Sequence, residues 1–340
     1  MTDGSGRDDA TLAAGLTRWF AHHHDLPGVE LTGFQRPSAG FSSDTVFFDA
    51  AWTSDGARHE RALVLRMAPP GDGTFPHYDL TVQWQAQQAA VAAGVPVADP
   101  VLEPGTGWIG TPFLLMPRVE GHLVGGVTHR DRWLLTLDDS ARGALYRDFV
   151  AVLSRIHRSD VPLDSAIPRR DNGAELDHWD AYLTWSSGGS PVATLVDALG
   201  WCRDHRPAAE PEPALLWGDA RLENAVIGDD LRVRAVLDWD MTSIGAPEHD
   251  LAWFTGLDLT MGHLFGERTA GFPDRAETIA LFEGHCGRPV EHLAWYETLA
   301  MVRSTAVMTR LGYLQRDAGR PLLLPIDDNP ILDLLRGRLS

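Results

Sequence analysis

The chain has 340 residues, of which 44% are hydrophobic and 22% charged, so it holds enough apolar material for a folded core. Its 47 acidic and 29 basic residues give a net charge of −18, which disfavours nucleic-acid and anionic-membrane partners. There is no membrane-length apolar run, no secretory leader, and only two cysteines, so we expect a cytoplasmic protein without a disulfide framework or a zinc site.

The amino-terminal third of the chain predicts a helix followed by strands. Residues 1–25 are expected to form a helical extension, and the three histidines at 22–24 are interpreted as an exposed helix end rather than a metal site. A turn of small residues at 38–45 precedes an alternating strand over residues 46–52. Small residues let backbone N–H groups approach a phosphate, although the same turn is also typical of an ordinary hairpin.

A second strand is expected over residues 61–67, and a helix over residues 79–93. The strand carries Arg66. Because the chain contains no lysine, a compositional bias explains this arginine as well as a function does. A guanidinium can nevertheless form two parallel hydrogen bonds to phosphate oxygens.

Further along, residues 112–117 predict a buried strand that runs into a connector at residues 116–121. Apolar residues then recur at helical spacing from Leu145 to Ile156, which predicts a helix ending at His157. A single histidine that closes an apolar helix is interpreted as a structural hydrogen-bonding residue.

The strongest chemical signal lies between residues 215 and 240. Asp219 and Asn224 are five residues apart on a predicted loop, and Asp238 ends a strand that follows a turn at residues 228–230. A hairpin there would bring the three side chains together. Asp238 and Asn224 offer hard oxygen ligands that can share Mg²⁺ with phosphate oxygens. Asp219 could orient a substrate hydroxyl and accept its proton, so the pattern indicates phosphoryl transfer.

These residues resemble the signature of the aminoglycoside phosphotransferase and choline-kinase-like superfamily, HGDxxxxN followed by D-[FWI]-[DE]. Here the motifs read Trp-Gly-Asp-Ala-Arg-Leu-Glu-Asn at residues 217–224 and Asp-Trp-Asp at 238–240. Residues 245–253 are similar to the family's G-x-P-x-x-D-L-A segment. The chain also resembles the branch of bacterial phosphotransferases similar to the kinase domains fused to acyl-CoA dehydrogenases, through residues 271–275, 287–289 and 295–297.

The resemblance implies an α+β fold of two lobes, as in protein kinases. A small amino-terminal lobe would hold an antiparallel sheet, and a larger carboxy-terminal lobe would be mainly helical. After the helical extension at residues 1–25, the small lobe would span residues 26–115 and the hinge residues 116–121. The large lobe, at residues 122–340, would hold the catalytic loop and the acceptor site.

The resemblance also implies a nucleotide site between the lobes. The turn at residues 38–45 would be the nucleotide loop, and Arg66 would replace the lysine that reaches the phosphates. The hinge would meet the adenine edge, although Pro117 has no amide to donate. The residues expected to contact the nucleotide are Ser38, Gly40, Phe41, Ser42, Ser43, Arg66, Met116, Arg118 and Val119.

Besides Arg66, two further positions depart from the family pattern. Gln83 falls where relatives have the glutamate that pairs with the lysine, and its amide would hold Arg66 by hydrogen bonding alone unless Asp79 substitutes for it. Trp217 replaces the histidine before Gly-Asp, and we expect it to fill the space while losing the imidazole's hydrogen bond. Supporting roles are expected for Gln83, for Asp240 in the outer shell of the metal, and for Asp250 as a brace of the catalytic loop.

The main hypothesis is a Mg²⁺-dependent kinase that transfers the γ-phosphate of ATP or GTP to a hydroxyl of an aminoglycoside-like acceptor, a hydroxy-acyl thioester or another metabolite. The few residues between Asp238 and Pro247 leave no room for a phosphorylatable activation segment, which favours a small-molecule acceptor. The alternative, motivated by Arg66, Gln83 and Trp217, is a catalytically weak nucleotide-binding scaffold. A metal hydrolase is disfavoured because no His/Cys ligand cluster has suitable spacing.

Overall fold

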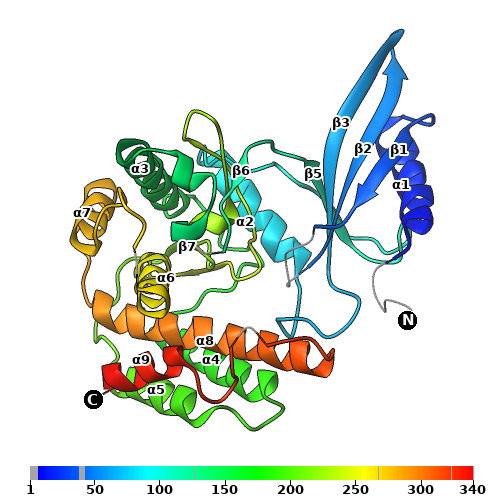
Figure 1. The fold of residues 1–340 in the computed structure, drawn as a ribbon. Helices are drawn as coiled ribbons and strands as arrows, with labels where there is room; N and C mark the ends of the chain where they lie inside the picture. Colours follow the sequence, from blue (N-terminus) through cyan, green and yellow to red (C-terminus); the bar gives the residue numbers. More distant parts are fainter. Residues whose placement is uncertain (1–6, 38–42, 127, 267, 323, 340) are drawn as a thin grey trace.

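The computed structural model describes residues 7–37, 43–126, 128–266, 268–322 and 324–339. The chain forms two lobes, one built on a five-stranded sheet and one dominated by helices (Figure 1). The expected two-lobed α+β fold is therefore confirmed. None of the helices in these ranges combines the length and the apolar character needed to cross a membrane.

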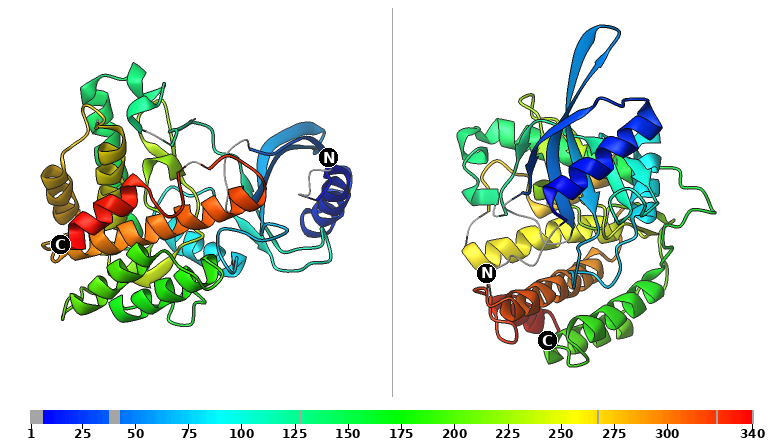
Figure 2. Two further views of the ribbon diagram at one scale, coloured as in Figure 1. Left: turned by 60° about the horizontal axis from the view of Figure 1, so that its bottom comes forward. Right: turned by 90° about the vertical axis from the view of Figure 1, so that its right-hand side faces the viewer.

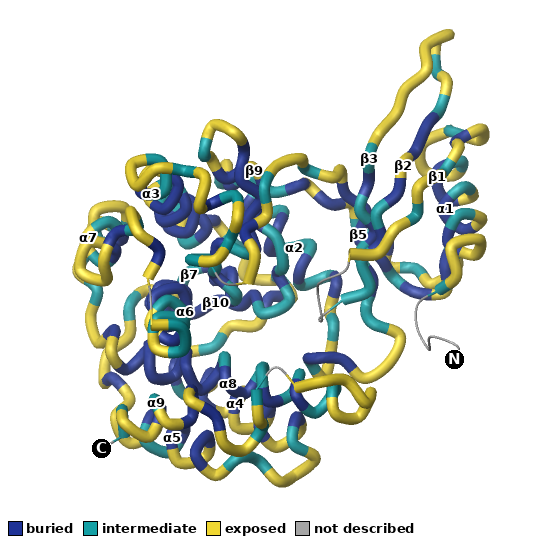
Figure 3. The backbone as a smooth tube through the Cα atoms, in the orientation of Figure 1, coloured by how far each residue is buried: buried dark blue, intermediate teal, exposed yellow. Residues whose placement is uncertain are grey.

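The sheet of the amino-terminal lobe has the strand order β1-β2-β3-β5-β4, and every neighbouring pair is antiparallel. Successive side chains of a strand point to opposite faces, so Leu63 and Leu65 of β3 enter one core while Val64 enters another. The far ends of β2 and β3 project as an exposed hairpin (Figure 3). The strands are β1 (Glu30–Gln35), β2 (Asp44–Ser54), β3 (Ala57–Met67), β4 (Val101–Glu103) and β5 (Phe113–Pro117).

Helix α1 (Asp9–His24) lies along one face of this sheet (Figure 2). The helix begins after Asp8, whose carboxylate accepts a hydrogen bond from the amide of Thr11 at 2.8 Å. Leu16 and Trp19 are buried against the sheet. The three histidines at residues 22–24 are exposed at the end of the helix, as expected.

Helix α2 (Leu80–Ala92) packs on the opposite face, where Leu80 joins Leu114 and Met116 in a small core. Asp79 caps this helix, because its carboxylate accepts hydrogen bonds from the amides of Thr81 and Val82. The helix agrees with the prediction. Asp79 is committed to the cap, so the idea that it replaces Gln83 as the partner of Arg66 is wrong.

The carboxy-terminal lobe packs its helices around two small sheets, β6-β8-β9 and β7-β10. Its strands are β6 (His122–Leu123), β7 (Ala214–Leu216), β8 (Ala225–Ile227), β9 (Val233–Val236) and β10 (Ser243–Gly245). The α-helices are α3 (Asp139–Ile156), α4 (Asn172–Ser186), α5 (Ala193–Asp204), α6 (Glu248–Phe265), α7 (Arg275–Cys286), α8 (Leu293–Asp317) and α9 (Pro330–Leu339). Short 3₁₀ turns are η1 (Thr128–Arg130), η2 (Leu134–Thr136) and η3 (Leu222–Asn224). The predicted helix ending at His157 and the hairpin around residues 228–230 are both present.

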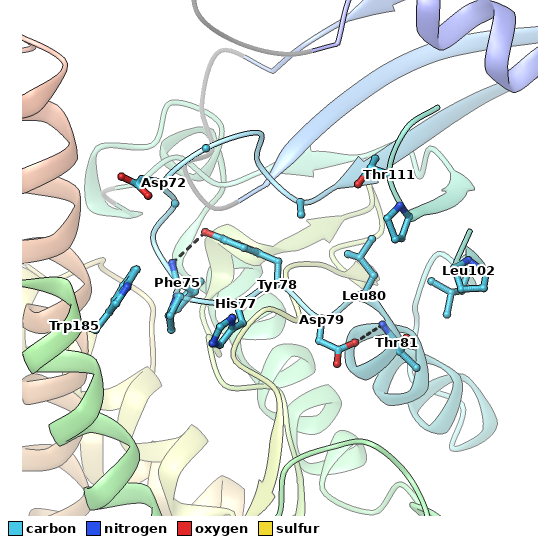
Figure 4. Close-up of a pocket in the computed structure, with 16 residues that line it drawn as sticks. Asp72, Phe75, His77, Tyr78, Asp79, Leu80, Thr81, Leu102, Thr111 and Trp185 are labelled. Carbon is cyan, nitrogen blue, oxygen red and sulfur yellow. Dashed lines mark hydrogen bonds between the residues drawn. The ribbon is translucent and has the colours of Figure 1, made fainter. Parts of the chain in front are cut away.

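The segment between β3 and α2, residues 68–79, is anchored on the carboxy-terminal lobe. Tyr182 of α4 donates its hydroxyl to the carbonyl of Thr74 at 2.8 Å, and Nε of Arg310 in α8 donates to the carbonyl of Gly73 at 3.0 Å. Figure 4 shows this segment and Trp185 of α4 on the wall of one open pocket. Because α2 follows the segment directly, these contacts help to fix where that helix begins.

Candidate active site

The loop that carries Asp219 follows β7 and turns sharply at Gly218. The φ angle of Gly218 is +91°, and a Cβ at this position would lie 2.3 Å from the carbonyl oxygen of Met241, so only glycine fits. The single turn of η3 then returns Asn224 toward Asp219. The five-residue spacing in the sequence thus corresponds to one tight loop.

Three donors hold the carboxylate of Asp219. Its Oδ1 accepts a hydrogen bond from the indole Nε1 of Trp253 at 2.8 Å. Its Oδ2 accepts one from Nδ2 of Asn224 at 2.7 Å and lies 3.1 Å from Nη2 of Arg221. Burial raises the pKa of Asp219, while the Arg221 charge and the two hydrogen bonds oppose that rise. The side chain keeps 13% of its surface exposed, so a small molecule can reach it.

Asp238 lies against the same loop. The amide of Leu237 donates to the carbonyl of Asn224 at 2.8 Å, which holds the segment after β9 beside the Asp219 loop. Asp238 has φ of +57°, a left-handed conformation that is uncommon for residues other than glycine and often found at functional sites. The sequence prediction that Asp219, Asn224 and Asp238 lie together agrees with this geometry.

Arg66 of β3 reaches across from the amino-terminal lobe. Its Nη2 lies 2.8 Å from Oδ1 of Asp238 and 2.8 Å from Oδ2 of Asp240. Its Nε donates to Oε1 of Gln83 at 3.2 Å, and the amide nitrogen of Gln83 donates in turn to Asp240. Burial alone would lower the pKa of Arg66, but the carboxylates of Asp240 and Asp238 raise it above its usual range. Burial would also raise the pKa of Asp238, and the Arg66 charge instead holds it below its usual range.

Asp250, in the first turn of α6, is buried beneath the Asp219 loop. Its two carboxylate oxygens accept hydrogen bonds from the amides of Trp217 at 2.8 Å and Gly218 at 2.9 Å. Nε2 of His157 lies 3.0 Å from the same carboxylate. These contacts give Asp250 the geometry expected of a brace, and His157 the contact expected of a structural histidine.

Trp217 stands where the resembled family has a histidine, and only 1% of its surface is exposed. Its indole Nε1 donates to the carbonyl of Leu237 at 2.8 Å. The substitution therefore keeps a hydrogen bond at this position, contrary to expectation. The bond ties the Asp219 loop to the segment that precedes Asp238.

The expected hinge residues lie at the end of β5 and just beyond it. Met116 is buried beside α2, and Val119 packs on the same small core. The amide of Arg118 donates to the carbonyl of Ala62 at 2.9 Å, so this hinge donor is already engaged within the protein. The Arg118 guanidinium lies 5.1 Å above the ring of Phe47.

The expected nucleotide loop falls mostly outside the described residues. Within the described part, Oγ of Ser43 lies 3.4 Å from Oγ1 of Thr45 at the start of β2. The predicted contacts that lie outside it are Ser38, Gly40, Phe41 and Ser42.

Three residues at the site carry contacts that the sequence analysis did not identify. Arg221 occupies a variable position within the motif, and Trp253 belongs to an aromatic cluster to which the sequence assigns no specific site role. The spacing of Asp250 and Trp253, three residues apart on α6, places them on one helix face and was a usable signal. Arg303 comes from α8, where its Nη2 donates to the carbonyl of Gly218, and no local pattern in the sequence connects it to the Asp219 loop.

The oxygen donors of the site fit a magnesium ion. Within the part of the chain that the structure describes, no group of three or more His, Cys, Asp or Glu side chains could hold a metal. Asp238 and Asn224 nevertheless lie on adjoining segments. Because Nδ2 of Asn224 faces Asp219, its amide oxygen points to the other side. Two hard oxygen donors suit Mg²⁺, which takes few protein ligands and keeps phosphate oxygens and water as the others.

Comparison with protein families gives a match to the phosphotransferase enzyme family over residues 33–278. Among curated proteins, the chain is 26% identical over 237 residues to acyl-CoA dehydrogenase family member 11 of Pongo abelii, covering 65% of this chain and 29% of that protein. It is 30% identical over 236 residues to the Rattus norvegicus protein of the same name, with the same two shares of 65% and 29%. The chain thus spans less than a third of the length of these relatives.

Solved structures share the two-lobed fold. A candidate aminoglycoside phosphotransferase from Ralstonia eutropha matches with a TM-score of 0.69 at 21% identity, covering 96% of this chain and 94% of that one. The GDP complex of a mutant aminoglycoside 2'-phosphotransferase matches with a TM-score of 0.55 at 14% identity, covering 96% and 97%. At these identities the matches establish the fold.

Proposed function

Because the chain belongs to the phosphotransferase enzyme family, whose members transfer phosphoryl groups to hydroxyl acceptors, we propose that it is a Mg²⁺-dependent small-molecule kinase that uses ATP or GTP. The observation that supports this proposal is the convergence of Asp219, Asn224 and Asp238 beside the Arg66 guanidinium. Phosphoryl transfer asks the protein mainly to position its reactants and to neutralise charge. This cluster of side chains can position the reactants and neutralise charge.

Asp219 would act on the acceptor. The acceptor hydroxyl oxygen forms a bond to the terminal phosphorus as the bond to the bridging oxygen breaks, and the nucleoside diphosphate leaves with the bond's electron pair. The hydroxyl proton passes to the Asp219 carboxylate. Burial raises the pKa of this carboxyl, which makes the carboxylate a stronger base than an exposed aspartate.

Asp238 and Asn224 would hold the metal. Asp240 would lie in the outer shell of the metal, without binding it directly. Bound Mg²⁺ would neutralise the phosphate charge that builds up during transfer. Asp240 is nearly buried, and its contacts with Arg66 and Gln83 fix it at the edge of the donor set. Asp250 would keep the Asp219 loop in register with the donors through its two amide contacts.

Two arginines would face the phosphates. Arg66 would take the role of the family's lysine and fork hydrogen bonds to phosphate oxygens. Arg221 lies beside Asp219 with 40% of its side chain exposed, and its Nε has no hydrogen-bond partner among the described residues. A guanidinium placed there can stabilise the charge on the phosphoryl group in transfer.

The remaining nucleotide contacts are proposed from the family resemblance. The turn at residues 38–45 would cradle the phosphates with its backbone N–H groups. The hinge would border the base through Met116, Arg118 and Val119. Because the Arg118 amide already bonds to Ala62, the amide of Val119 is the donor that we propose for the base. The loop contacts would come from Ser38, Gly40, Phe41, Ser42 and Ser43.

Two acceptor classes follow from the names of the proteins that the chain is similar to. An aminoglycoside-like acceptor is proposed from the name of the solved structure, and a hydroxy-acyl thioester is proposed because the curated relatives are named for acyl-CoA dehydrogenases. Both present a hydroxyl group that Asp219 could orient.

The proposal is tested by comparing the wild type with Asp219→Asn. We expect the variant to bind Mg²⁺-nucleotide within about twofold of the wild type in calorimetry, while transfer falls by roughly 10²–10⁴-fold because the base is lost. Asp229→Asn is the matched control, since Asp229 lies in the β8–β9 turn with 97% of its side chain exposed. Transfer is measured over a panel of both acceptor classes.

Two outcomes would contradict the proposal. A wild-type protein that binds nucleotide but transfers to no acceptor in the panel, and does not hydrolyse the nucleotide, would favour the scaffold alternative. An Asp219→Asn variant that transfers as fast as the Asp229→Asn control would remove Asp219 from the reaction.

A further inference from the structure

Both oxygens of the Asp219 carboxylate have hydrogen-bonding or charged partners. Asn224 and Arg221 approach Oδ2, whereas only the indole N–H of Trp253 is seen to approach Oδ1 among the described residues. A carboxylate turns easily about its Cβ–Cγ bond, because that torsion has broad minima. Donors on both oxygens therefore fix the plane of the group, and the bond from Trp253 holds the side that the other two donors leave free.

Trp253 is itself held in place by a buried cation. The guanidinium of Arg303 lies 5.0 Å from the ring centre of Trp253 and 5.3 Å from that of Trp179. Arg303 and Trp253 are only 3% and 4% exposed. Cation–π contacts strengthen when they are shielded from water, so the indole plane of Trp253 is fixed against a rigid neighbour.

Arg303 is anchored in turn on α4 and on the Asp219 loop. Its Nε lies 3.7 Å from Oε1 of Glu175, which also accepts a hydrogen bond from Nε1 of Trp179 at 2.9 Å. Its Nη2 donates to the carbonyl of Gly218 at 3.4 Å, one residue before Asp219. Burying a guanidinium is costly unless it is paired. The Glu175 carboxylate and the two indole rings face the Arg303 charge, while Nε and Nη1 of Arg303 have no hydrogen-bond partner among the described residues.

We infer that Trp253 is a positioning residue for phosphoryl transfer, which sets the orientation of the Asp219 carboxylate, and that Arg303 holds the indole for this purpose. The inference rests on the proposed function, because it needs Asp219 to act on the acceptor hydroxyl. Without the indole N–H, the carboxylate turns toward Asn224 and Arg221. Its free lone pair then no longer faces the acceptor.

The test is Trp253→Phe, which keeps one aromatic ring beside Arg303 and removes the five-membered ring that carries the indole N–H. We expect kcat for Mg²⁺-ATP hydrolysis, measured as phosphate release, to fall by roughly tenfold or more, while KM for ATP stays within about twofold. Trp295→Phe is the matched control. It removes a buried indole hydrogen bond of similar length, 2.9 Å to the carbonyl of Cys202, away from the Asp219 loop. A purely structural role would give the two variants the same kcat.

A crystal structure of Trp253→Phe provides a second readout, in which we expect the Asp219 carboxylate to have rotated. A kcat within about twofold of the Trp295→Phe control, or an Asp219 carboxylate in its wild-type orientation, overturns the inference. If Trp253→Phe does not fold, Arg303→Met replaces it and is expected to change kcat and the carboxylate in the same direction. An unchanged kcat and an unchanged carboxylate orientation in Arg303→Met would also overturn the inference.

Failure of the proposed function gives a different pattern. In that case the wild type itself releases no phosphate and transfers to no acceptor. The orientation of Asp219 in the Trp253→Phe crystal structure then decides alone whether Trp253 positions the carboxylate.

Discussion

The residue that departs from the family pattern at position 83 has an electrostatic explanation. Arg66 already faces two carboxylates, Asp238 and Asp240. Gln83 accepts a hydrogen bond from Arg66 with its oxygen and donates one to Asp240 with its nitrogen. A glutamate could do only the first and would place a third negative charge against Asp240. The neutral amide therefore completes the network that two aspartates have already made acidic.

This explanation predicts that Gln83→Glu weakens the fold although it restores the family residue. We expect the free energy of unfolding at neutral pH to fall by about 1–3 kcal/mol, because a buried donor is lost and Asp240 faces a like charge. Urea unfolding measures the change. Gln85→Glu on the same helix is the control, since within the described part of the chain Gln85 uses only its oxygen, as an acceptor from the amide of Ala166. Equal stability of the two variants would contradict the explanation.

His157 gives a prediction for pH. Burial alone would lower its pKa, but the hydrogen bond to Asp250 raises it above the unfolded value. A raised pKa means that its stabilising contribution is complete below the unfolded pKa of about 6.5 and is lost as pH rises through the folded pKa. The free energy of unfolding should therefore fall over this interval.

His157→Gln should flatten that decline, and His263→Gln, at an exposed position of α6, should leave it unchanged. Urea unfolding at a series of pH values from about 6 to about 9 measures both. An identical pH profile for wild type and His157→Gln would rule out the contribution.

For individual residues, the sequence predicted those that a local hairpin brings together. It did not predict those that the packing of distant helices brings to the site. Asp219, Asn224 and Asp238 are joined by one loop and one turn, so their spacing contains the geometry. Counting along the chain also placed Gln83 beside Arg66. The contact of Trp253 with Asp219 and the position of Arg303 depend on how α6 and α8 pack, and short-range patterns carry no such information.

At the scale of elements, the segment between β3 and α2 links the lobes. Tyr182→Phe removes the hydroxyl that bonds to the carbonyl of Thr74. Since α2 carries Gln83, we expect a looser Arg66 contact and a nucleotide affinity about five times weaker, which corresponds to about 1 kcal/mol for one hydrogen bond. Calorimetry with Mg²⁺-nucleotide measures it. Tyr313→Phe on α8 is the control, and equal affinities of the two variants would show that the anchor does not reach the site.

Elements with a clear period or cap were predictable, and very short ones were not. The helix over residues 79–93 was found from its start and stop signals, and α2 begins at the cap that Asp79 provides. Strand β10 has three residues, too few for a periodic pattern, although it pairs with β7 beneath the Asp219 loop. The anchoring of residues 68–79 was also not predictable, because its donors lie more than a hundred residues away.

At the scale of the whole molecule, ligands that bridge the two lobes should stabilise the fold. Mg²⁺-nucleotide at about a hundred times its dissociation constant is expected to add about 2.7 kcal/mol to the free energy of unfolding. Chelation of the metal should remove most of this gain, because Asp238 and Asn224 would then lack the cation that links them to the phosphates. Thermal unfolding with and without a chelator measures the difference. The same gain in both conditions would contradict a metal-dependent site.

The ion pairs of Arg66 with Asp238 and Asp240 predict that metal binding and nucleotide binding are thermodynamically coupled. A cation that takes Asp238 as its ligand deprives the guanidinium of one counter-charge, and a triphosphate supplies the replacement. A triphosphate that recruits the guanidinium likewise releases a carboxylate for the cation. If the proposed site is correct, each ligand would therefore make room for the other. By reciprocity, the factor by which the metal tightens nucleotide binding must equal the factor by which the nucleotide tightens metal binding.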